Sequence, residues 1–310
     1  MNNLKKVGLT ALAGSLAAST AFAGVLEVTG SASVKYQSRS GSSGTSSVQG
    51  NPWSDGNGIT FSGSGDLDNG MTVGYSYTMT DAAFSTSNVT LDMGDNGKLA
   101  FGHDSAHGGI DTIKDKMPTA GEEVWDDIGS GDDAGVTDVG ADPSLYYSIN
   151  LSGITASASY SRTGNATDNS VALVASELVD GAEFGIGTAT NAISNTSEDD
   201  MITAYGKYTT GAFTIGVQLS DTDKTAANSD VGREAAALSF AVNENLSISY
   251  GISTVEYEAS TKTDAESTGV SASYTMGGIT LGAVSNKTDS FGGTAGTDKE
   301  FTEIKLSFAF

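Results

Sequence analysis

The segment 301-FTEIKLSFAF-310 alternates between apolar and polar residues along most of its length. Successive side chains of a β-strand point to opposite faces of the sheet. Every second residue from Thr302 to Phe310 would therefore lie on a mostly apolar face, with Glu303 and Lys305 on the polar face. Soluble sheets tend to end in polar, frayed residues. In a transmembrane β-barrel, the apolar face would instead meet lipid and the last aromatic would lie at the membrane–water interface.

The first 23 residues have the pattern of an export signal. Two lysines precede an apolar run over residues 7–18, and Ala21-Phe22-Ala23 supplies a small-x-small cleavage site. The apolar run is too short and too rich in Ala and Ser for a spanning helix. A buried first helix is the alternative, and it fits these features less well. We expect cleavage before Gly24.

The composition of the mature chain excludes several classes of protein. Residues 24–310 carry 13 basic and 38 acidic groups, a net charge of −25. Phosphate binding needs a basic surface, so nucleic acid is not expected as a partner. The chain has no cysteine, which rules out disulfides and thiolate sites. Its 40 glycines against 3 prolines favour a continuous sheet with tight turns over a disordered chain.

Alternating hydrophobicity predicts sixteen strands after the export signal. In MTVGYSYTM, for example, Met71, Val73 and Tyr75 share a face. The predicted strands are 25–36, 58–66, 70–79, 86–94, 97–103, 143–150, 153–161, 169–177, 182–189, 200–208, 212–220, 231–242, 245–252, 268–275, 279–286 and 299–310.

Short and long connections take turns between these strands. Several short ones contain Asn-Gly or Asp-Gly, which tolerate the positive φ angles of tight hairpins. The seven short connections are 67–70, 94–97, 150–153, 178–181, 209–211, 243–245 and 276–278. The eight long connections are 37–57, 80–85, 104–142, 162–168, 190–199, 221–230, 253–267 and 287–298. The alternation places all tight turns and both termini on one side of the sheet.

These features together predict the fold class. The last strand can pair with the first, and a closed sheet has no unpaired edge in lipid. The strand lengths match the roughly 9–11 residues that cross a bilayer when tilted, and a barrel of this size leaves an aqueous lumen. We therefore predict an all-β fold, a 16-stranded antiparallel transmembrane β-barrel. A soluble secreted all-β protein is the alternative, but it gives no reason for the alternating connections.

The third long connection, 104–142, differs from the others. It has 39 residues, and its eleven acids against two bases give a net charge of −9. Structureless loops of more than about 15 residues are usually functional or disordered. Val124, Trp125 and Ile128 are among its apolar residues, which free disordered loops rarely carry.

The export signal, the sixteen strands, the long acidic loop and Phe310 together make the chain resemble the bacterial general-diffusion porins. Its acidic composition and Gly-rich turns bring it nearest to those of alphaproteobacteria. The resemblance covers residues 24–310 and rests on the order of the elements rather than on a sharp motif. It implies a homotrimer in the Gram-negative outer membrane, with loop 104–142 folded into the lumen as a constriction. It also implies that carboxylates on this loop face basic side chains on the opposite wall.

Carried onto this chain, the resemblance points to four acids of the constriction. They are flanked by apolar residues that would anchor the loop to the wall. These acids are Glu122, Glu123, Asp126 and Asp127.

Candidate bases on the wall must face the lumen. Lys35 and Lys305 each alternate with apolar neighbours, so both would point inward on adjoining strands. Arg39 lies close to Lys35, and Arg233 is a weaker candidate. The chain has only three arginines, fewer than the basic ladder of familiar porins, which argues against a strong transverse field. An ordinary solvated group is the alternative for each of these charges.

These observations predict passive diffusion of small hydrophilic solutes and ions, with cations favoured because carboxylates concentrate cations. A substrate-specific channel is the closest alternative. An enzyme fits less well, because His103 and His107 are the only histidines and no third zinc ligand has a recognisable spacing. An adhesin or purely structural barrel gives no reason for loop 104–142.

No cofactor is expected, although Ca²⁺ could bind paired acids. Asp126 with Asp127, or Asp132 with Asp133, are the candidate pairs, but no EF-hand spacing is present. By resemblance, Phe310 would also be the assembly signal for the outer-membrane insertion machinery. A simple interface anchor explains this aromatic residue equally well.

Overall fold

The computed structural model describes residues 26–41, 51–103, 108–126, 128, 143–163, 166–194 and 197–310. The predicted export signal, 1–23, lies outside these ranges. The strands are β1 (Glu27–Gly41), β2 (Trp53–Asp66), β3 (Thr72–Thr80), β4 (Ala83–Asp92), β5 (Lys98–His103), β6 (Ser144–Asn150), β7 (Ile154–Thr163), β8 (Ala166–Ala175), β9 (Ala182–Ser194), β10 (Ser197–Thr210), β11 (Phe213–Asp223), β12 (Val231–Ala241), β13 (Leu246–Tyr257), β14 (Ala265–Met276), β15 (Ile279–Asp289) and β16 (Lys299–Ala309).

Short 3₁₀ helices occur in some of the connections. They are η1 (Gly94–Asn96), η2 (Gly109–Thr112) and η4 (Phe291–Gly293). Within the ranges that the structure describes, no helix has the length and apolar character needed to cross a membrane.

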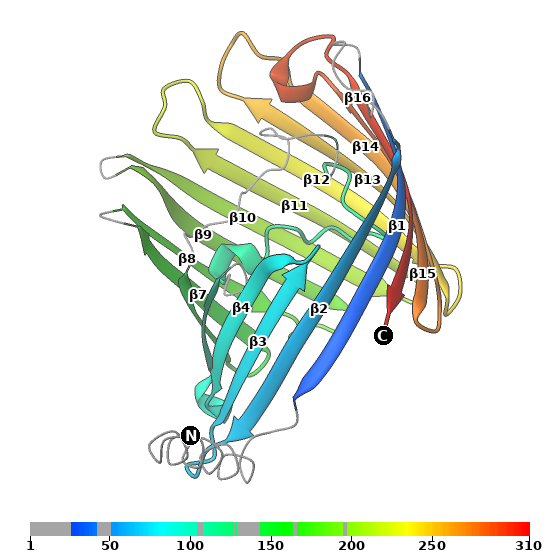
Figure 1. The fold of residues 1–310 in the computed structure, drawn as a ribbon. Coiled ribbons are helices and arrows are strands. Elements are labelled where there is room, and N and C mark those ends of the chain that lie inside the picture. The colour runs from blue at the N-terminus through cyan, green and yellow to red at the C-terminus, as the bar shows by residue number, and fades with distance from the viewer. Residues whose placement is uncertain are drawn as a thin grey trace, which may run out of the picture.

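The strands form one closed antiparallel barrel (Figure 1). Each strand pairs with its neighbours in the sequence, and β1 pairs with β16 to close the sheet. The predicted Asn-Gly turns form as expected: Gly70 has a φ of 82°, and its N–H donates to the carbonyl of Leu67 at 2.9 Å. The prediction of an all-β, 16-stranded antiparallel barrel is therefore confirmed.

The strict alternation of short and long connections is wrong at three places. The strands on either side of 80–85, 162–168 and 190–199 run on until only two residues separate them. Asp81 and Ala82 both have positive φ, 49° and 63°, and so make a tight turn without the usual glycine signal. The ends at 162–168 and 190–199 are largely polar, so hydrophobic alternation cannot mark where these strands stop.

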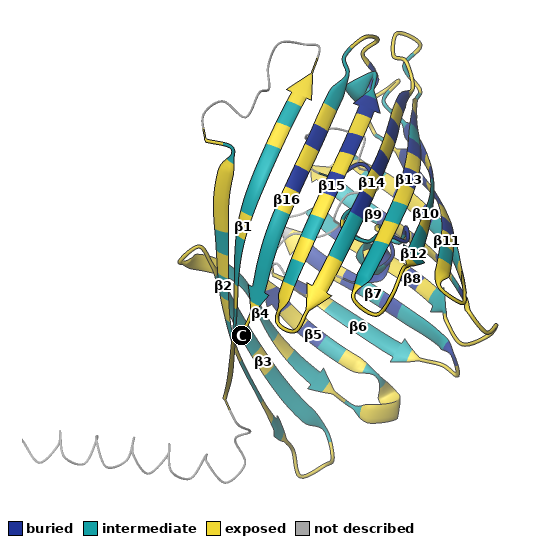
Figure 2. Cartoon of the chain, turned by 90° about the vertical axis from the view of Figure 1, so that its right-hand side faces the viewer, coloured by how far each residue is buried: buried dark blue, intermediate teal, exposed yellow. Residues whose placement is uncertain are grey.

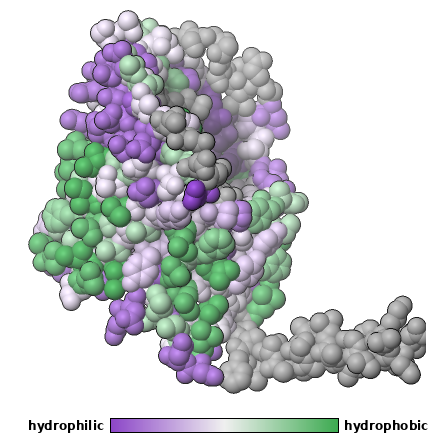
Figure 3. All heavy atoms as spheres, turned by 90° about the vertical axis from the view of Figure 1, so that its left-hand side faces the viewer, coloured by the Kyte–Doolittle hydropathy of each residue, from purple (hydrophilic) through white to green (hydrophobic). Residues whose placement is uncertain are grey.

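The two faces of the barrel have different chemistry. Along β11, Val217 and Leu219 point outward and are 54% and 57% exposed, whereas Gln218 between them is fully buried. Figure 2 shows the same alternation as bands along the strands. Figure 3 shows hydrophobic residues gathered over the middle of the outer surface, with hydrophilic residues above them. The apolar face therefore points outward and the polar face lines the interior.

Candidate functional site

The loop after β5 lies inside the barrel and is attached to the inner wall. Ile110 and Ile113 are fully buried in a cluster with Ala172 of β8 and Met201 of β10. The Ile110 N–H donates to Ser170 Oγ at 3.2 Å. These contacts form the first anchor of the loop, around η2.

A second apolar anchor follows farther along the loop. Met117, Val124 and Trp125 are buried against Ala235 of β12, with Ala237 packed beside them. Burial of large apolar side chains contributes roughly 1.5–3 kcal/mol each. The apolar residues of the acidic loop therefore hold it to the wall, as the sequence predicted.

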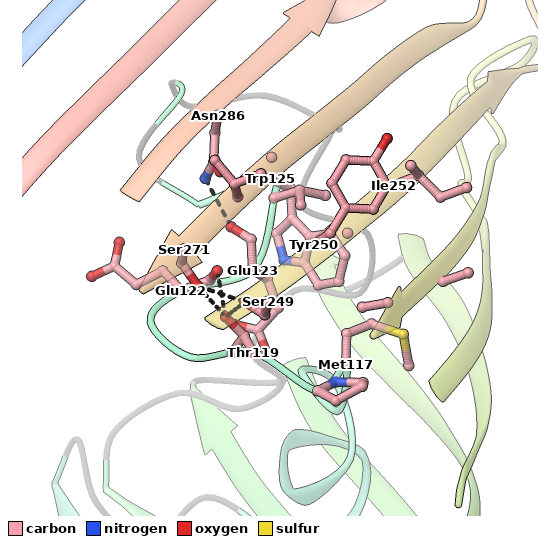
Figure 4. Close-up of a pocket in the computed structure, with 17 residues that line it drawn as sticks. Met117, Thr119, Glu122, Glu123, Trp125, Ser249, Tyr250, Ile252, Ser271 and Asn286 are labelled. Atoms are coloured by element: carbon pink, nitrogen blue, oxygen red, sulfur yellow. Dashed lines mark hydrogen bonds between the residues drawn. The ribbon is translucent and has the colours of Figure 1, made fainter. Parts of the chain in front are cut away.

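Polar side chains of β13 to β15 form hydrogen bonds with loop residues 119–123. Thr119 Oγ1 lies 3.4 Å from Ser249 Oγ and 3.2 Å from Ser271 Oγ. Asn286 Nδ2 donates to the Glu123 carbonyl at 3.0 Å. Figure 4 shows these residues converging on the loop from neighbouring strands. They satisfy loop groups that would otherwise be buried without partners.

Gln218 of β11 joins the two anchors. Its Nε2 donates to the carbonyls of Ile113 and Lys114, at 2.9 and 2.8 Å. Its Oε1 accepts the N–H of Lys116 at 3.2 Å. One buried amide thus binds three backbone groups within residues 113–116, and the described loop is held from β8 to β15.

Glycines on the inner wall make room for the loop. A Cβ on Gly187 would lie 2.8 Å from Ile113 Cδ1, and one on Gly251 would lie 2.7 Å from Val124 Cγ1. Sequence reasoning missed these contacts, although a signal was present. Glycine weakens a strand and often marks the close approach of another chain segment.

Three of the four predicted loop acids lie in the described ranges. Glu122, Glu123 and Asp126 are partly buried, and Asp127 falls outside. The Glu123 N–H donates to Asp126 Oδ2 at 3.1 Å. Burial raises the pKa of Glu123 to about 8, and the charge of Asp126, its side-chain hydrogen bond and the charge of Asp115 add to the shift. Glu123 is therefore mostly protonated at neutral pH.

The predicted wall bases come together at the closure of the barrel. Lys35 and Lys305 are directly paired on β1 and β16. Lys35 Nζ lies 3.7 Å from Glu303 Oε2. Arg39 lies near the extracellular-loop end of β1, with its guanidinium 4.8 Å from the centre of the Phe301 ring. Lys35 and Arg39 thus each contact a partner on the same wall.

Arg233 is not the lumen-facing base that the sequence suggested. It points inward from β12 but is only 2% exposed, because Trp125 of the loop covers it. The side chain lies between the loop and the wall. Periodicity gave its direction correctly but could not show that the loop would lie over it.

The inner face of β1 and its neighbours carries mainly neutral hydroxyl groups. Residues that share this face with Lys35 line a polar hollow of about 620 Å³. They include Thr29, Ser31, Ser33, Ser54, Thr60 and Thr78. Strand order places this face across the barrel from the first loop anchor on β8 to β10, whereas β15, which holds the Glu123 carbonyl, is two strands away from β1.

The seam between β1 and β16 includes Phe310. Its N–H donates to the Gly30 carbonyl at 3.0 Å, and its carbonyl accepts the Gly30 N–H at 2.6 Å. The residue is 78% exposed. These contacts place Phe310 at the closing strand pair, and its role as an assembly signal stays a prediction.

Metal binding gains no support from the described residues. Among them, no group of three or more His, Cys, Asp and Glu is placed to hold a metal ion. Asp127, Asp132, Asp133 and His107 lie outside the described ranges, so the calcium prediction stays open.

The chain is similar to known proteins in both sequence and fold. The model of the Gram-negative porin family matches residues 8–181, more than half of the chain. No curated protein sequence matches. An anion-selective porin from Comamonas acidovorans has a similar structure, with a TM-score of 0.70 at 15% identity, covering 92% of this chain and 99% of that one.

Two other solved structures have the same fold. A mutant of Rh. blastica porin matches with a TM-score of 0.65 at 12% identity, covering 92% of this chain and all of that one. A loop-deletion mutant of OmpT, an outer-membrane protein of Vibrio cholerae, matches with a TM-score of 0.67 at 13% identity, covering 93% and 99%. At these identities the matches show the fold alone.

Proposed function

Because the chain belongs to the Gram-negative porin family, we propose that this outer-membrane channel passes small hydrophilic solutes and ions by passive diffusion and favours cations. The protein is a general porin channel and not an enzyme. The observation that carries the proposal is an acidic loop packed inside the barrel and anchored from β8 to β15. A loop held in this way narrows the lumen.

The constriction in this proposal lies between the loop and the hydroxyl-lined face. Glu122 and Asp126, with Asp127 from the sequence, supply the loop carboxylates, and Glu123 adds another when it ionises at its raised pKa of about 8. Lys35, Lys305 and Arg39 supply the bases on β1 and β16. The anchoring of the neighbouring Val124 and Trp125 supports this assignment, since it holds the acids at a fixed depth.

Cation preference rests on the balance of charges in the lumen. Loop 104–142 carries a net charge of −9, and Glu303 offsets one of the two facing lysines through its 3.7 Å ion pair with Lys35. Carboxylate clusters attract cations and repel anions. The Comamonas porin shares the fold and is anion-selective, so side-chain charges and not barrel architecture must set the preference.

Hydroxyl groups on the facing wall support broad passage of hydrophilic solutes. Serine and threonine donate and accept hydrogen bonds and carry no charge, so they suit water and sugars without demanding one orientation. A substrate-specific channel would instead show saturable transport. The acidic composition and Gly-rich turns support the narrower assignment to the alphaproteobacterial type.

We also propose that the channel is a homotrimer in the outer membrane, as porin homologues typically are. Its mass in a mild detergent, measured by light scattering, tests this. Three chains per particle are expected, and a monomeric mass at all protein concentrations contradicts the proposal.

Planar-bilayer recording in a KCl gradient tests the proposed function. We expect stepwise conductance and a reversal potential of the sign for K⁺ over Cl⁻. The variant E122Q/D126N should move this potential toward zero, whereas E244Q, which removes an exposed acid from a short turn, should leave it unchanged. Marked anion preference rejects the cation assignment. Liposomes that do not swell in sugar solutions reject general diffusion.

A further inference from the structure

Arg233 occupies an unusual place for a charged residue. It lies on the inner face of β12, is only 2% exposed, and has its guanidinium carbon 3.9 Å from the centre of the Trp125 ring. At this distance the cation lies over the face of the indole, the strongest of the aromatic partners for such contacts. Its Nη2 also donates to the Lys114 carbonyl at 3.3 Å. One side chain therefore contacts the loop at Lys114, next to the first anchor, and at Trp125 of the second anchor.

The charge of Arg233 is matched by carboxyl groups of the loop. Asp115 and Asp126 act electrostatically on its guanidinium, as does Glu123 in its ionised form, and Lys114 pairs with Asp115 at 4.0 Å. A buried charge without compensation costs several kcal/mol. The cation and these acids therefore favour one another only while the loop lies against β12.

The other polar anchors work differently. Gln218 and Asn286 are neutral and bind loop backbone. Arg233 instead holds a loop side chain by its ring and balances the charge of loop carboxyl groups. Its loss would change both the position of the loop and the charge that the loop presents.

We propose that Arg233 is a positioning residue that clamps the constriction loop from behind and sets how far its carboxylates extend into the lumen. The inference rests on the proposed constriction and adds a residue that does not itself line the open path. Trp125 is its partner on the loop, and the pair acts as one unit.

The test uses two readouts on the full-length channel. R233M keeps much of the side-chain length but removes the charge and the planar group, R233K keeps the charge alone, and W125L removes the partner from the loop side. Trypsin cleavage after Lys114 and Lys116 reports whether the loop is docked, independently of conduction. Bilayer recording reports conductance, current noise and reversal potential.

We expect R233M and W125L to be cleaved about tenfold faster than the wild type, since a desolvated cation–π contact contributes at least this factor. The cleavage rate of R233K should lie between those of the wild type and R233M, because lysine keeps the charge but cannot reproduce the stacked, planar contact. Open-channel noise should rise, and the reversal potential should shift toward stronger cation preference in R233M. The double variant should add little to either single one, as expected for two residues that share one contact.

Lys262 provides the matched control. Its ammonium lies 4.1 Å from the centre of the Tyr257 ring, in the connection between β13 and β14, so K262M removes a cation–π contact outside both loop anchors. It should behave like the wild type. If R233M and W125L fold and show the cleavage rate, noise and selectivity of the wild type, the proposed role of Arg233 is rejected. Absence of wild-type conductance rejects the proposed function instead, and the cleavage rates then still decide whether Arg233 holds the loop.

Discussion

Glu123 combines two roles in the loop. Its backbone carbonyl is held by Asn286, while its carboxyl group lies among Asp126, Asp115 and the buried Arg233. Burial and the neighbouring acids favour the neutral carboxyl. A raised pKa means that the docked loop binds this proton more tightly than a released loop does. Docking is therefore strongest at low pH and weakens as pH rises from the ordinary value of 4.5 through about 8.

The pH dependence of the channel follows from this residue. Between pH 6 and pH 9, open-channel noise should increase and the reversal potential should shift toward stronger cation preference, because ionised Glu123 repels Asp126 and adds a negative charge to the lumen. Bilayer recordings at the two pH values measure both effects. In E123Q these pH-dependent changes should disappear, and the noise should stay at its low-pH level. E244Q should show the same changes as the wild type. Changes that persist in E123Q would assign the titration to another group.

At the scale of elements, the loop and the wall are shaped for each other. Bulky loop residues lie over glycines of the wall, as Val124 lies over Gly251. Hydrophobic spacing could not show this match, because alternation gives the face of a residue but not what approaches that face from across the chain. The buried position of Arg233 was hidden for the same reason. By contrast, the apolar content around Trp125 correctly predicted that the acidic loop is anchored.

Gly251 allows this match to be tested. In G251A the new Cβ would lie 2.7 Å from Val124 Cγ1, and such overpacking costs about 1–3 kcal/mol. The loop should move off the wall, so tryptic cleavage and current noise should rise while the barrel still forms. G282A is the control, since its Cβ would meet only the Lys305 carbonyl, at 3.9 Å. A folded G251A channel with a loop as protected as in the wild type would show that the loop tolerates the added methyl group.

At the scale of the molecule, the strand pattern was sufficient for the barrel but not for its rim. All sixteen predicted strands overlap strands of the structure, because each crosses an apolar belt that imposes a period of two. The rim lacks this constraint. There, β3 and β4 continue to the turn at Asp81 and Ala82, where the sequence predicted a longer connection. The pattern therefore predicts the part of a strand that meets lipid and misses the part that meets water.

The net charge of −23 makes ion selectivity depend on salt. The Debye length is about 10 Å at 0.1 M and about 3 Å at 1 M salt, so distant loop acids act on permeating ions only in dilute solution. At a fixed concentration ratio, cation preference should fall as both KCl concentrations are raised. Sugar-driven liposome swelling should change little, because neutral solutes do not respond to the field. Equal preference at both salt levels would place the selective charges within a few ångströms of the ions.

The described part of the loop is anchored on β8–β15 and not on the hydroxyl-lined face of β1, β2 and β3. Val124 and Trp125 restrict what the anchoring half of the wall can accept, whereas Thr60 and Thr78 on the other half hydrogen-bond to each other at 2.9 Å. Pore width and wall chemistry are therefore held by different sets of residues. Natural drift or deliberate redesign can alter one while the other stays intact, so new solute preferences are within reach without rebuilding the constriction.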